Sequence, residues 1–327
     1  MLDVYKNRKE TTMIEIQNLV KRYGKNYAVN DISFSVNKGE IVGFLGPNGA
    51  GKSTTMNILT GYLSATSGSV KIAGVDVLEN PIEAKKHIGF LPEHPPLYLD
   101  MTVKEYLSFV FDLKKCNLNK KKHIDEIVDV INIGEVYKRP ISHLSKGYRQ
   151  RVGIAQALIS SPDILIFDEP TVGLDPRQIM EIRSLINSLG KSHTVILSTH
   201  ILPEVKAVCD RVVIINKGQL VADAKTDELE AVTGQRKMMV KICGPREEVL
   251  PTLKGINGVT SCQLLPWRDA DSFSYLVESD TNADVRKPIF NAVCNKGWAM
   301  IGLESMSDSL EDVFIAILDK DKKEENK

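Results

Sequence analysis

The stretch Gly46-Pro47-Asn48-Gly49-Ala50-Gly51-Lys52-Ser53-Thr54 decides the fold of this chain. It fits G-x-x-x-x-G-K-[ST], the pattern of a loop whose backbone wraps around phosphate groups. The segment Glu40–Leu45 before it predicts a short buried strand, and residues 53–59 after it predict the first turns of a helix. Strand, glycine loop and helix in this order are the context that the motif requires.

The residue types in this loop suit phosphate binding. Glycines let backbone N–H groups approach an anion with no Cβ in the way, and the start of a helix adds unpaired N–H donors. Lys52 is a compact cation that can reach the β- and γ-phosphates. The Ser53 hydroxyl can bind Mg²⁺, which takes few protein ligands. The alternative is an ordinary glycine-rich turn, and the flanking strand and helix argue against it.

The composition of the chain narrows the functional classes. A length of 327 residues predicts two domains. Lys plus Arg and Asp plus Glu both number 42, which argues against a large nucleic-acid footprint. The five cysteines are scattered without a C-x-x-C pair, as is typical of reduced thiols in a cytosolic protein. No apolar run is long enough to span a membrane. Residues 1–12 are polar and resemble no secretory signal; they are either a disordered extension or lie ahead of a natural start at Met13.

A second group of polar residues follows buried strands. Residues 164–167 are a continuous apolar run that ends in Asp168 and Glu169, which predicts a central parallel strand with a site at its carboxyl end. Asp168 would hold the water shell of Mg²⁺. Glu169 would orient or deprotonate an attacking water, an effect worth roughly 10²–10⁴-fold in rate. His200 ends the next buried strand; a lone histidine is usually structural, but this position makes it a candidate γ-phosphate contact.

Several further residues stand out, although each has an ordinary structural interpretation when taken alone. Tyr23 near a strand end either packs or stacks on an adenine base, since every base has a π-face. Glu93 lies in a proline-rich loop, where a glutamate is normally a solvated charge. Ser145 is a good helix N-cap, and with Gly147 it offers either backbone donors to an anion or only a capped structural helix. Asp175 caps the next helix, with proline at its first position.

Taken together, these motifs resemble those of an ABC-transporter nucleotide-binding subunit. The resemblance covers about residues 13–233, and five motifs occur in the order of that family: the phosphate loop, Leu144-Ser145-Lys146-Gly147, Asp168-Glu169, Gly173-Leu174-Asp175 and His200. It implies an α/β P-loop ATPase core with an antiparallel β subdomain and an α-helical subdomain at about residues 102–160.

The resemblance also implies roles and partners. Two cassettes, as a homodimer or with a close paralogue, pack head to tail around ATP and Mg²⁺. Ser145 and Gly147 then bind the γ-phosphate across the dimer. Glu169 matches the catalytic base, His200 the switch histidine, Asp175 the loop that links the two sites, and Tyr23 the adenine-stacking aromatic. Integral membrane permease subunits are the other partners, and the chain is expected in the cytoplasm, peripheral on the inner face of the cell membrane.

Two positions depart from the pattern of the family. Lys146-Gly147-Tyr148 stands where Gly-Gly-Gln is usual, which leaves the serine and the second glycine in place. Glu93 stands where a glutamine usually contacts magnesium and the membrane partner, and we predict that Glu93 still ligates magnesium. The segment Leu91–His94 and the C-terminal extension resemble the drug-resistance and gliding-motility branch of exporters.

Beyond residue 233 the sequence predicts a second, smaller domain. Residues 234–236 resemble a hinge, and residues 234–319 follow the order β-α-β-β-α-β of an accessory ferredoxin-like α+β domain, with a last helix at 309–318. Residues 320–327 form a charged tail. No catalytic pattern is visible in this domain.

The predicted function is therefore an ATPase that drives a separate permease. One alternative is a soluble ABC-type ATPase that acts on a ribosome or a nucleic-acid machine; a single phosphate loop and the absence of a long coiled coil argue against it. Another is a nucleotide switch without hydrolysis, which the retained Lys52, Asp168, Glu169 and His200 disfavour. The substrate and the direction of transport depend on the permease.

Overall fold

The computed structural model describes residues 11–226, 235–269, 271–280 and 283–306. Backbone contacts divide the chain into two compact units, residues 1–226 and 227–327. The sequence placed this boundary between residues 233 and 234. The strand β11 already begins at Gln235, so Gln235 and Arg236 belong to a strand, and their assignment to a hinge is wrong.

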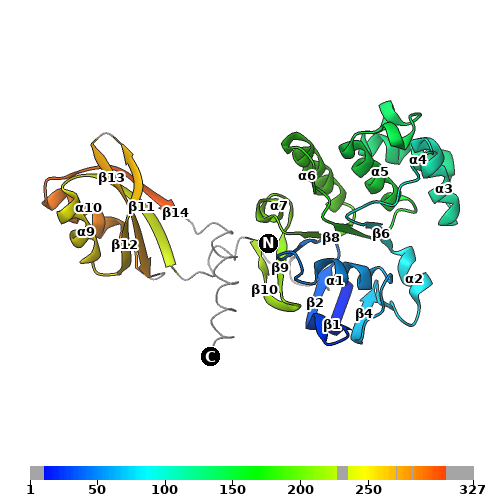
Figure 1. Cartoon of the computed structure of the whole chain (residues 1–327), viewed down its shortest axis with the longest axis horizontal. Helices are drawn as coiled ribbons and strands as arrows, with labels where there is room; N and C mark the ends of the chain where they lie inside the picture. The colour runs from blue at the N-terminus through cyan, green and yellow to red at the C-terminus, as the bar shows by residue number, and fades with distance from the viewer. Residues whose placement is uncertain (1–10, 227–234, 270, 281–282, 307–327) are drawn as a thin grey trace, which may run out of the picture. The chain divides into compact units, whose positions relative to one another are not determined.

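A six-stranded sheet forms the centre of the first unit (Figure 1). Its inner strands are parallel, and only the edge strand β10 runs antiparallel to its neighbour. The strands, in spatial order, are β10 (Gln219–Lys225), β9 (Arg211–Asn216), β3 (Ile41–Leu45), β8 (Thr194–Thr199), β7 (Ile164–Asp168) and β6 (Ile88–Leu91). The accompanying helices are α1 (Lys52–Leu59), α6 (Pro176–Gly190) and α7 (Leu202–Val208).

Burial explains why the strands β3, β7 and β8 are continuous apolar runs. All of their residues are buried, because helices or a second sheet cover both faces of the central sheet. Helix α1 lies between the central sheet and a smaller sheet and contacts both (Figure 1). The parallel arrangement brings the carboxyl ends of β3, β7 and β8 to one edge, next to the start of α1.

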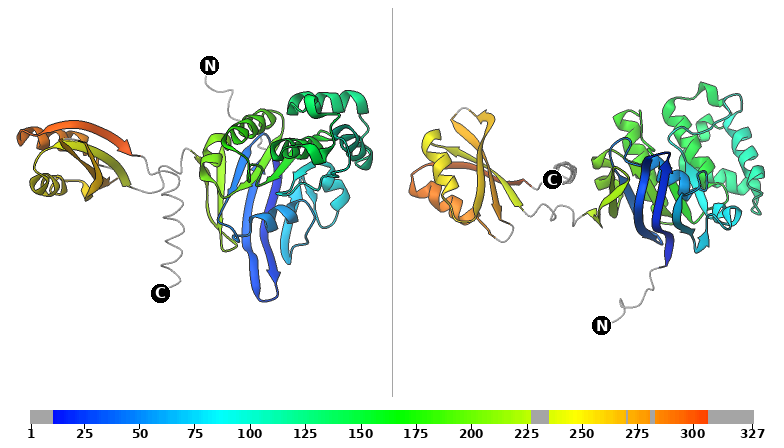
Figure 2. Two further views of the ribbon diagram at one scale, coloured as in Figure 1. Left: turned by 45° about the horizontal axis from the view of Figure 1, so that its top comes forward. Right: turned by 60° about the horizontal axis from the view of Figure 1, so that its bottom comes forward.

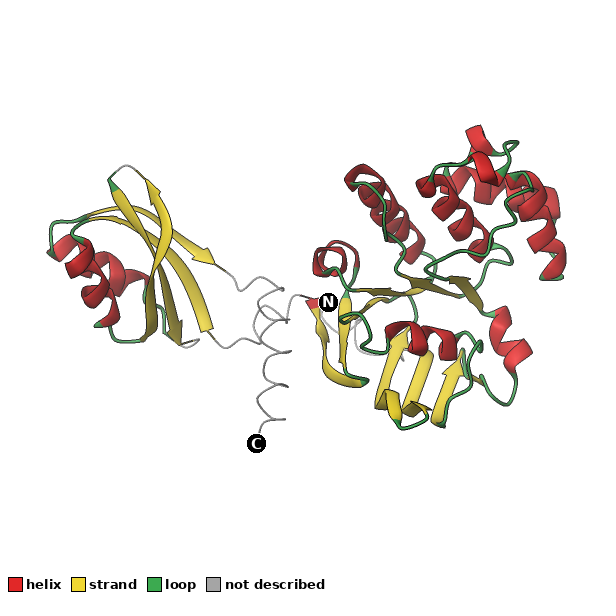
Figure 3. Cartoon of the chain, in the orientation of Figure 1, coloured by secondary structure: helices red, strands yellow, loops and turns green. Residues whose placement is uncertain are grey.

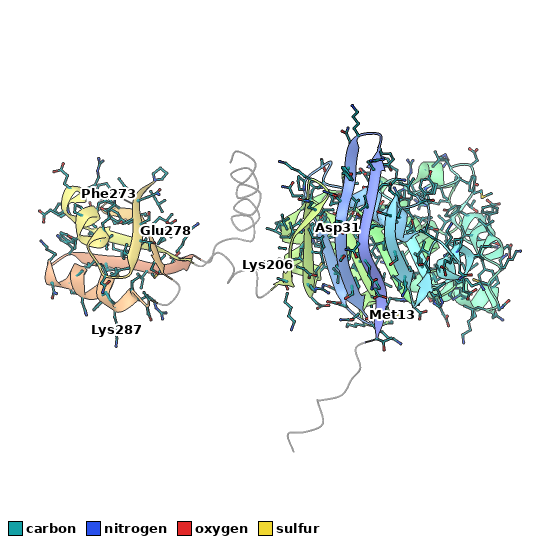
Figure 4. The ribbon with its side chains drawn as sticks, turned by 90° about the horizontal axis from the view of Figure 1, so that it is seen from below. Met13, Asp31, Lys206, Phe273, Glu278 and Lys287 are labelled. Atoms are coloured by element: carbon teal, nitrogen blue, oxygen red, sulfur yellow. The ribbon has the colours of Figure 1, made fainter. Side chains whose placement is uncertain are left out.

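The smaller sheet is antiparallel, as the sequence predicts, and its strand order is β2-β1-β4-β5. Its long hairpin is visible in both views of Figure 2. The elements are β1 (Thr12–Tyr23), β2 (Asn26–Asn37), β4 (Ser67–Ile72), β5 (Val75–Asp76) and the helix α2 (Pro81–Lys86) that follows. The strand β1 begins at Thr12, one residue before the boundary expected at Met13. Met13, labelled in Figure 4, is buried in this strand.

The helical subdomain is formed by the segment in which the sequence predicts helices (Figure 3). Its elements are α3 (Val103–Leu113), α4 (Lys120–Ile131), two short 3₁₀ turns, η1 (Gly134–Val136) and η2 (Ile141–His143), and α5 (Lys146–Leu158). A capping box starts α3: Glu105 N–H donates to Thr102 Oγ1, and Thr102 N–H donates to the Glu105 carboxylate. Apolar side chains at helical spacing fill the space between these helices.

The second unit has the predicted order β-α-β-β-α-β. Its elements are β11 (Gln235–Cys243), α9 (Arg246–Lys254), β12 (Val259–Asp269), β13 (Ser272–Asp280), α10 (Arg286–Asn295) and β14 (Ala299–Met306), and the sheet order is β12-β13-β11-β14. Alternation along β13 separates two faces: Phe273 packs on the apolar core, whereas Glu278 pairs with Lys237 at 4.0 Å (Figure 4). The predicted helix at 309–318 and the charged tail lie outside the described residues.

Among the described residues, none of the helices combines the length and the apolar character that crossing a bilayer requires.

Candidate active site

The phosphate loop connects β3 to α1 in a conformation that requires glycine. Gly51 has a φ of 109° and serves as the N-cap of α1 without a side chain. A Cβ on Gly51 would lie 2.4 Å from the carbonyl oxygen of Ala28, and one on Gly46 would lie 2.3 Å from that of Ile215. The backbone can therefore pass this close to its neighbours only without side chains, and the N–H groups in the first turn of α1 remain available to an anion.

A cavity of about 440 Å³ opens at this loop. That volume is in the usual range for the binding site of a small molecule. The cavity is lined by one residue of β2, by residues from the phosphate loop and the start of α1, and by loops that follow three other strands: Ala28, Asn48, Gly49, Gly51, Lys52, Ser53, Thr54, Glu93, Glu169, Val172 and His200. The structure thus brings together nine residues that the sequence proposes for the site, although they are distributed over more than 150 positions of the chain.

Lys52 lies between the phosphate loop and a catalytic candidate. Its Nζ donates hydrogen bonds to the carbonyl oxygens of Gly46 at 2.8 Å and Pro47 at 3.3 Å, and it lies 3.4 Å from Glu169 Oε1. Only 6% of Lys52 is exposed, so these oxygens replace the water that the ammonium would otherwise bind. The charge of Lys52 is held at the mouth of the helix start, where phosphate oxygens would bind.

Ser53 and Asp168 place hard oxygen atoms next to each other. Ser53 Oγ donates to Asp168 Oδ1 at 3.3 Å, and Ser198 Oγ donates to the same oxygen. Asp168 is buried at the end of β7, and this burial is the main reason why its pKa is raised above its usual value. A cation close to the carboxylate would offset the cost of burying the negative charge.

Glu169 is held in an unusual backbone conformation. Its φ of 49° lies in the left-handed region, which is uncommon for a residue with a long side chain. Two acceptors on Ser198 fix its N–H: the carbonyl oxygen at 3.1 Å and Oγ at 3.2 Å. The carboxylate then lies between Lys52 and His200, whose Nδ1 is 3.0 Å from both carboxylate oxygens. A strained residue of this kind at a cavity is typical of a functional site.

Glu93 reaches the cavity from the loop after β6. Its side chain is partly exposed, and His94 Nδ1 lies 3.9 Å from its carboxylate. The loop therefore places the Glu93 carboxylate at the cavity. The sequence alone had left open that Glu93 was an ordinary solvated charge.

The remaining predicted residues do not line this cavity. Ser145 caps α5 by accepting from Tyr148 N–H at 3.4 Å, and Asp175 caps α6 by accepting from Gln178 N–H at 2.9 Å. A Cβ on Gly147 would lie 2.8 Å from the Gln178 side chain, so the starts of these two helices are in contact. Tyr23 is half exposed at the end of β1, with Lys21 Nζ 5.2 Å from the centre of its ring.

Sequence reasoning missed the polar residues that hold the site together. Ser198 anchors Asp168 and Glu169, and Thr171 and Thr199 both donate to the buried Glu204 of α7. Ser198 and Thr199 are polar residues at the end of a fully buried strand, just before His200, and this placement is the one signal that could have identified them.

Comparisons with known proteins identify the family of this chain. A family model described as "ABC transporter" matches residues 29–172. The bacitracin transport ATP-binding protein BcrA of Bacillus licheniformis is 39% identical over 222 residues, which cover 67% of this chain and 72% of BcrA. The ABC transporter ATP-binding protein YxlF of Bacillus subtilis (strain 168) is 33% identical over 307 residues, covering 94% of this chain and 99% of YxlF. This chain belongs to the ABC transporter family.

Within that family the chain is an ATP-binding subunit, and its enzymatic activity is ATP hydrolysis coupled to transport. Its cassette resembles the solved structure of a dimeric bacterial ABC transporter cassette, with a TM-score of 0.60 and 27% identity over 65% of this chain and 98% of that one. The relatives support the transport function over the alternative of an ATPase that acts on a ribosome or a nucleic-acid machine.

Proposed function

We propose that this ATP-binding subunit powers an exporter of the drug-resistance and gliding-motility type, working as a head-to-tail dimer beneath a separate membrane permease. The single observation that supports this most strongly is the placement of the Glu169 carboxylate between Lys52 and His200 at a phosphate loop. The bacitracin transport protein among the relatives supports the drug-resistance branch.

The chemistry that we propose assigns one task to each side chain. The phosphate loop and Lys52 bind the triphosphate of ATP, which draws the ammonium away from Glu169 and towards the γ-phosphate. Glu169, released from this ion pair, accepts a proton from the water that attacks the γ-phosphate. His200 holds the Glu169 carboxylate in place through its Nδ1. Burial of both Lys52 and Glu169 strengthens these electrostatic effects, because little water screens them.

Magnesium fits the donors of this site. Ser53 and Asp168 supply a hydroxyl and a carboxylate within 3.3 Å of each other, and the burial of Asp168 leaves a negative charge that a cation would offset. In the part of the chain that the structure describes, no three His, Cys, Asp or Glu residues could together hold a metal, which agrees with an ion that keeps most of its waters. Bound Mg²⁺ would neutralise charge on the phosphates, and we propose Glu93 as a third ligand.

The starts of α5 and α6 support the dimer. Ser145 and Asp175 are exposed, and neither residue lines the cavity. Gly147 in the first turn is buried next to Gln178, but the cap Ser145 is exposed and can bind the γ-phosphate held by a partner subunit. Asp175 would link the two sites. Tyr23 is exposed enough to stack on adenine. Similarity to a cassette solved as a dimer supports the same arrangement.

We propose that the permease contacts the loop that follows Glu93. Tyr98 and Leu99 are 54% and 46% exposed, and the rings of Tyr98 and Phe109 pack in a T-shaped arrangement with 5.4 Å between ring centres. The exposed apolar side chains follow Pro95 and Pro96 in the chain, in the same loop as the cavity residue Glu93. Such a contact would place the subunit in the cytoplasm, peripheral on the inner face of the membrane. The domain boundaries at residues 13–233 and 234–319 are part of the same proposal.

Hydrolysis and self-association test this function together. Glu169→Gln keeps the shape of the site but cannot accept the proton, so it should bind ATP and hydrolyse it roughly 10²–10⁴ times more slowly. With ATP and Mg²⁺ it should also accumulate as a dimer in light scattering. Ser145→Ala in the Glu169→Gln chain should weaken that dimer without weakening ATP binding to the monomer. Unchanged hydrolysis by Glu169→Gln would refute the assignment of the base, and a persistent monomer, with or without its permease, would refute the dimer.

A further inference from the structure

Glu204 of α7 is a buried carboxylate for which the proposed chemistry has no use. Only 2% of the residue is exposed. Thr171 Oγ1 donates a hydrogen bond to Glu204 Oε1, and Thr199 Oγ1 donates to Oε2 at 2.8 Å. Arg183 of α6 is more distant, with its Nη2 3.9 Å from Oε1. Both oxygens of Glu204 are thus occupied by hydroxyl groups from two loops of the active site.

These two hydroxyl groups belong to residues next to the catalytic pair. Thr171 is two positions after Glu169, and Thr199 comes directly before His200. Thr199 Oγ1 also accepts from Ile201 N–H at 3.0 Å, which fixes the chain on the other side of His200. Glu204 therefore joins the segment that carries the base to the segment that carries its histidine partner.

Ser198 holds the base from the opposite direction. Its Oγ and carbonyl oxygen accept from Glu169 N–H, and its Oγ donates to Asp168. The left-handed Glu169 is thus anchored on its own N–H by Ser198 and two residues later by Glu204 through Thr171. A residue in this conformation is disfavoured by its own backbone energy, so only anchors on both sides can keep it there.

A role in stability alone explains the position of Glu204 poorly. Burying a carboxylate costs free energy unless a cation or several donors compensate it. Arg183 compensates it only weakly, because it is 3.9 Å away and its buried Nε has no hydrogen-bond partner among the residues that the structure describes. The closer partners are the two threonines of the active-site loops.

We infer that Glu204 is a positioning residue for ATP hydrolysis, which keeps Glu169 and His200 in register by bridging Thr171 and Thr199. This inference rests on the proposed role of Glu169 as the base. It predicts that the bridge affects the chemical step and leaves ATP binding alone, because none of its members lines the cavity or belongs to the phosphate loop.

The test compares steady-state hydrolysis of Mg²⁺-ATP by full-length variants. Glu204→Gln keeps the volume of the side chain but has only one acceptor oxygen for two hydroxyl donors. Thr171→Val removes one hydroxyl at nearly constant volume and serves if Glu204→Gln does not fold. Either change should lower kcat about ten- to a hundredfold, because small misplacements of catalytic groups are costly, and should change KM for ATP less than about twofold.

A matched control is Glu40→Gln. Glu40 is a partly buried carboxylate in a polar network, with Arg211 Nη1 at 3.3 Å and Asn37 N–H at 2.9 Å. It directly precedes β3, at the end of that strand opposite to the phosphate loop. It should keep the parental kcat. The imidazole NMR signals of His200 should move in Glu204→Gln and Thr171→Val and stay in place in Glu40→Gln.

The outcomes separate this inference from the function on which it rests. A parental kcat in a folded Glu204→Gln or Thr171→Val chain would overturn the inference, as would a loss of activity that appears entirely in KM. If Glu169→Gln hydrolysed ATP as fast as the parent, the proposed function itself would fail. If kcat fell in Glu169→Gln but stayed at the parental value in Glu204→Gln and Thr171→Val, only the role of Glu204 would be overturned.

Discussion

His200 Nδ1 lies 3.0 Å from both carboxylate oxygens of Glu169. The same carboxylate is 3.4 Å from Lys52 Nζ, so the base candidate lies between a lysine and a histidine that come from two different loops. Side chains on both sides thereby fix the direction in which Glu169 can accept a proton.

Removing the histidine should slow hydrolysis and leave binding intact. In His200→Ala the Glu169 carboxylate loses one of its two partners and stays paired with Lys52, so we expect kcat to fall about 10²-fold. The affinity for ATP, measured by fluorescence titration, should change little because the phosphate loop is unaltered. His94→Ala, whose ring is 88% exposed, is the control. Full activity in His200→Ala would contradict the role of this contact.

Asp168→Asn should stabilise the fold of the nucleotide-free protein but lower its ATP hydrolysis. Burial raises the pKa of Asp168 in the folded state above its unfolded value. The ionised carboxylate therefore costs stability at neutral pH, and this cost disappears as pH falls below the unfolded value of about 3.9. We expect a higher Tm for Asp168→Asn than for the parent at pH 7 without Mg²⁺, and an advantage that shrinks towards pH 4.

Hydrolysis by Asp168→Asn should nevertheless fall by more than about 10²-fold, since a site built to stabilise charge loses a charged group. The exposed Asp129→Asn on α4 should change neither quantity. A lower Tm for Asp168→Asn at pH 7 would show that its hydrogen bonds with Ser53 and Ser198 outweigh the cost of burial.

Glu93→Gln tests the third magnesium ligand. An amide oxygen binds Mg²⁺ more weakly than a carboxylate, so the Mg²⁺ concentration for half-maximal hydrolysis should rise about tenfold at saturating ATP. The matched control is Glu83→Gln on α2, an exposed glutamate that pairs with Lys86. An unchanged magnesium dependence would remove Glu93 from the metal site.

Lys114 should make stability depend on alkaline pH. Its Nζ donates to the carbonyl oxygens of Ile159 at 2.8 Å and Gln156 at 3.3 Å, and burial lowers its pKa to about 8. Below this pH the ammonium is charged in both states and its burial costs up to about 3 kcal/mol. Between about pH 8 and 10.4 the folded state loses its proton first, so this cost fades as pH rises.

Urea denaturation at pH 7, 8, 9 and 10 should therefore show the parent gaining stability relative to Lys114→Met as pH rises. Lys104→Met, at an exposed position in α3, the helix for which Lys114 is the C-cap, should show a constant difference from the parent. A constant difference for Lys114→Met would mean that the carbonyl oxygens keep the ammonium charged despite its burial.

Much of the fold was predictable because its signals are local. The capping residues Ser145 and Asp175 each accept a hydrogen bond from a residue three positions later, as their sequence patterns predict. The assignment of Gln235 and Arg236 to a hinge was wrong, because cross-strand pairing with residues 279–280 extends β11 back to Gln235. Pairing of this kind depends on a distant segment that no short window contains.

By itself, the sequence determined the phosphate loop, the buried strands and the residue types at their ends, because glycine sterics and the spacing of apolar residues act over a few positions. Only the tertiary structure decided that Glu169 adopts a left-handed conformation between Lys52 and His200, and that Ser198, Thr171, Thr199 and Glu204 hold it there. Apart from the bond between Thr199 and Glu204, these contacts join residues that are about 30 or more positions apart along the chain. They form only when parallel strands bring their ends to one edge of the sheet.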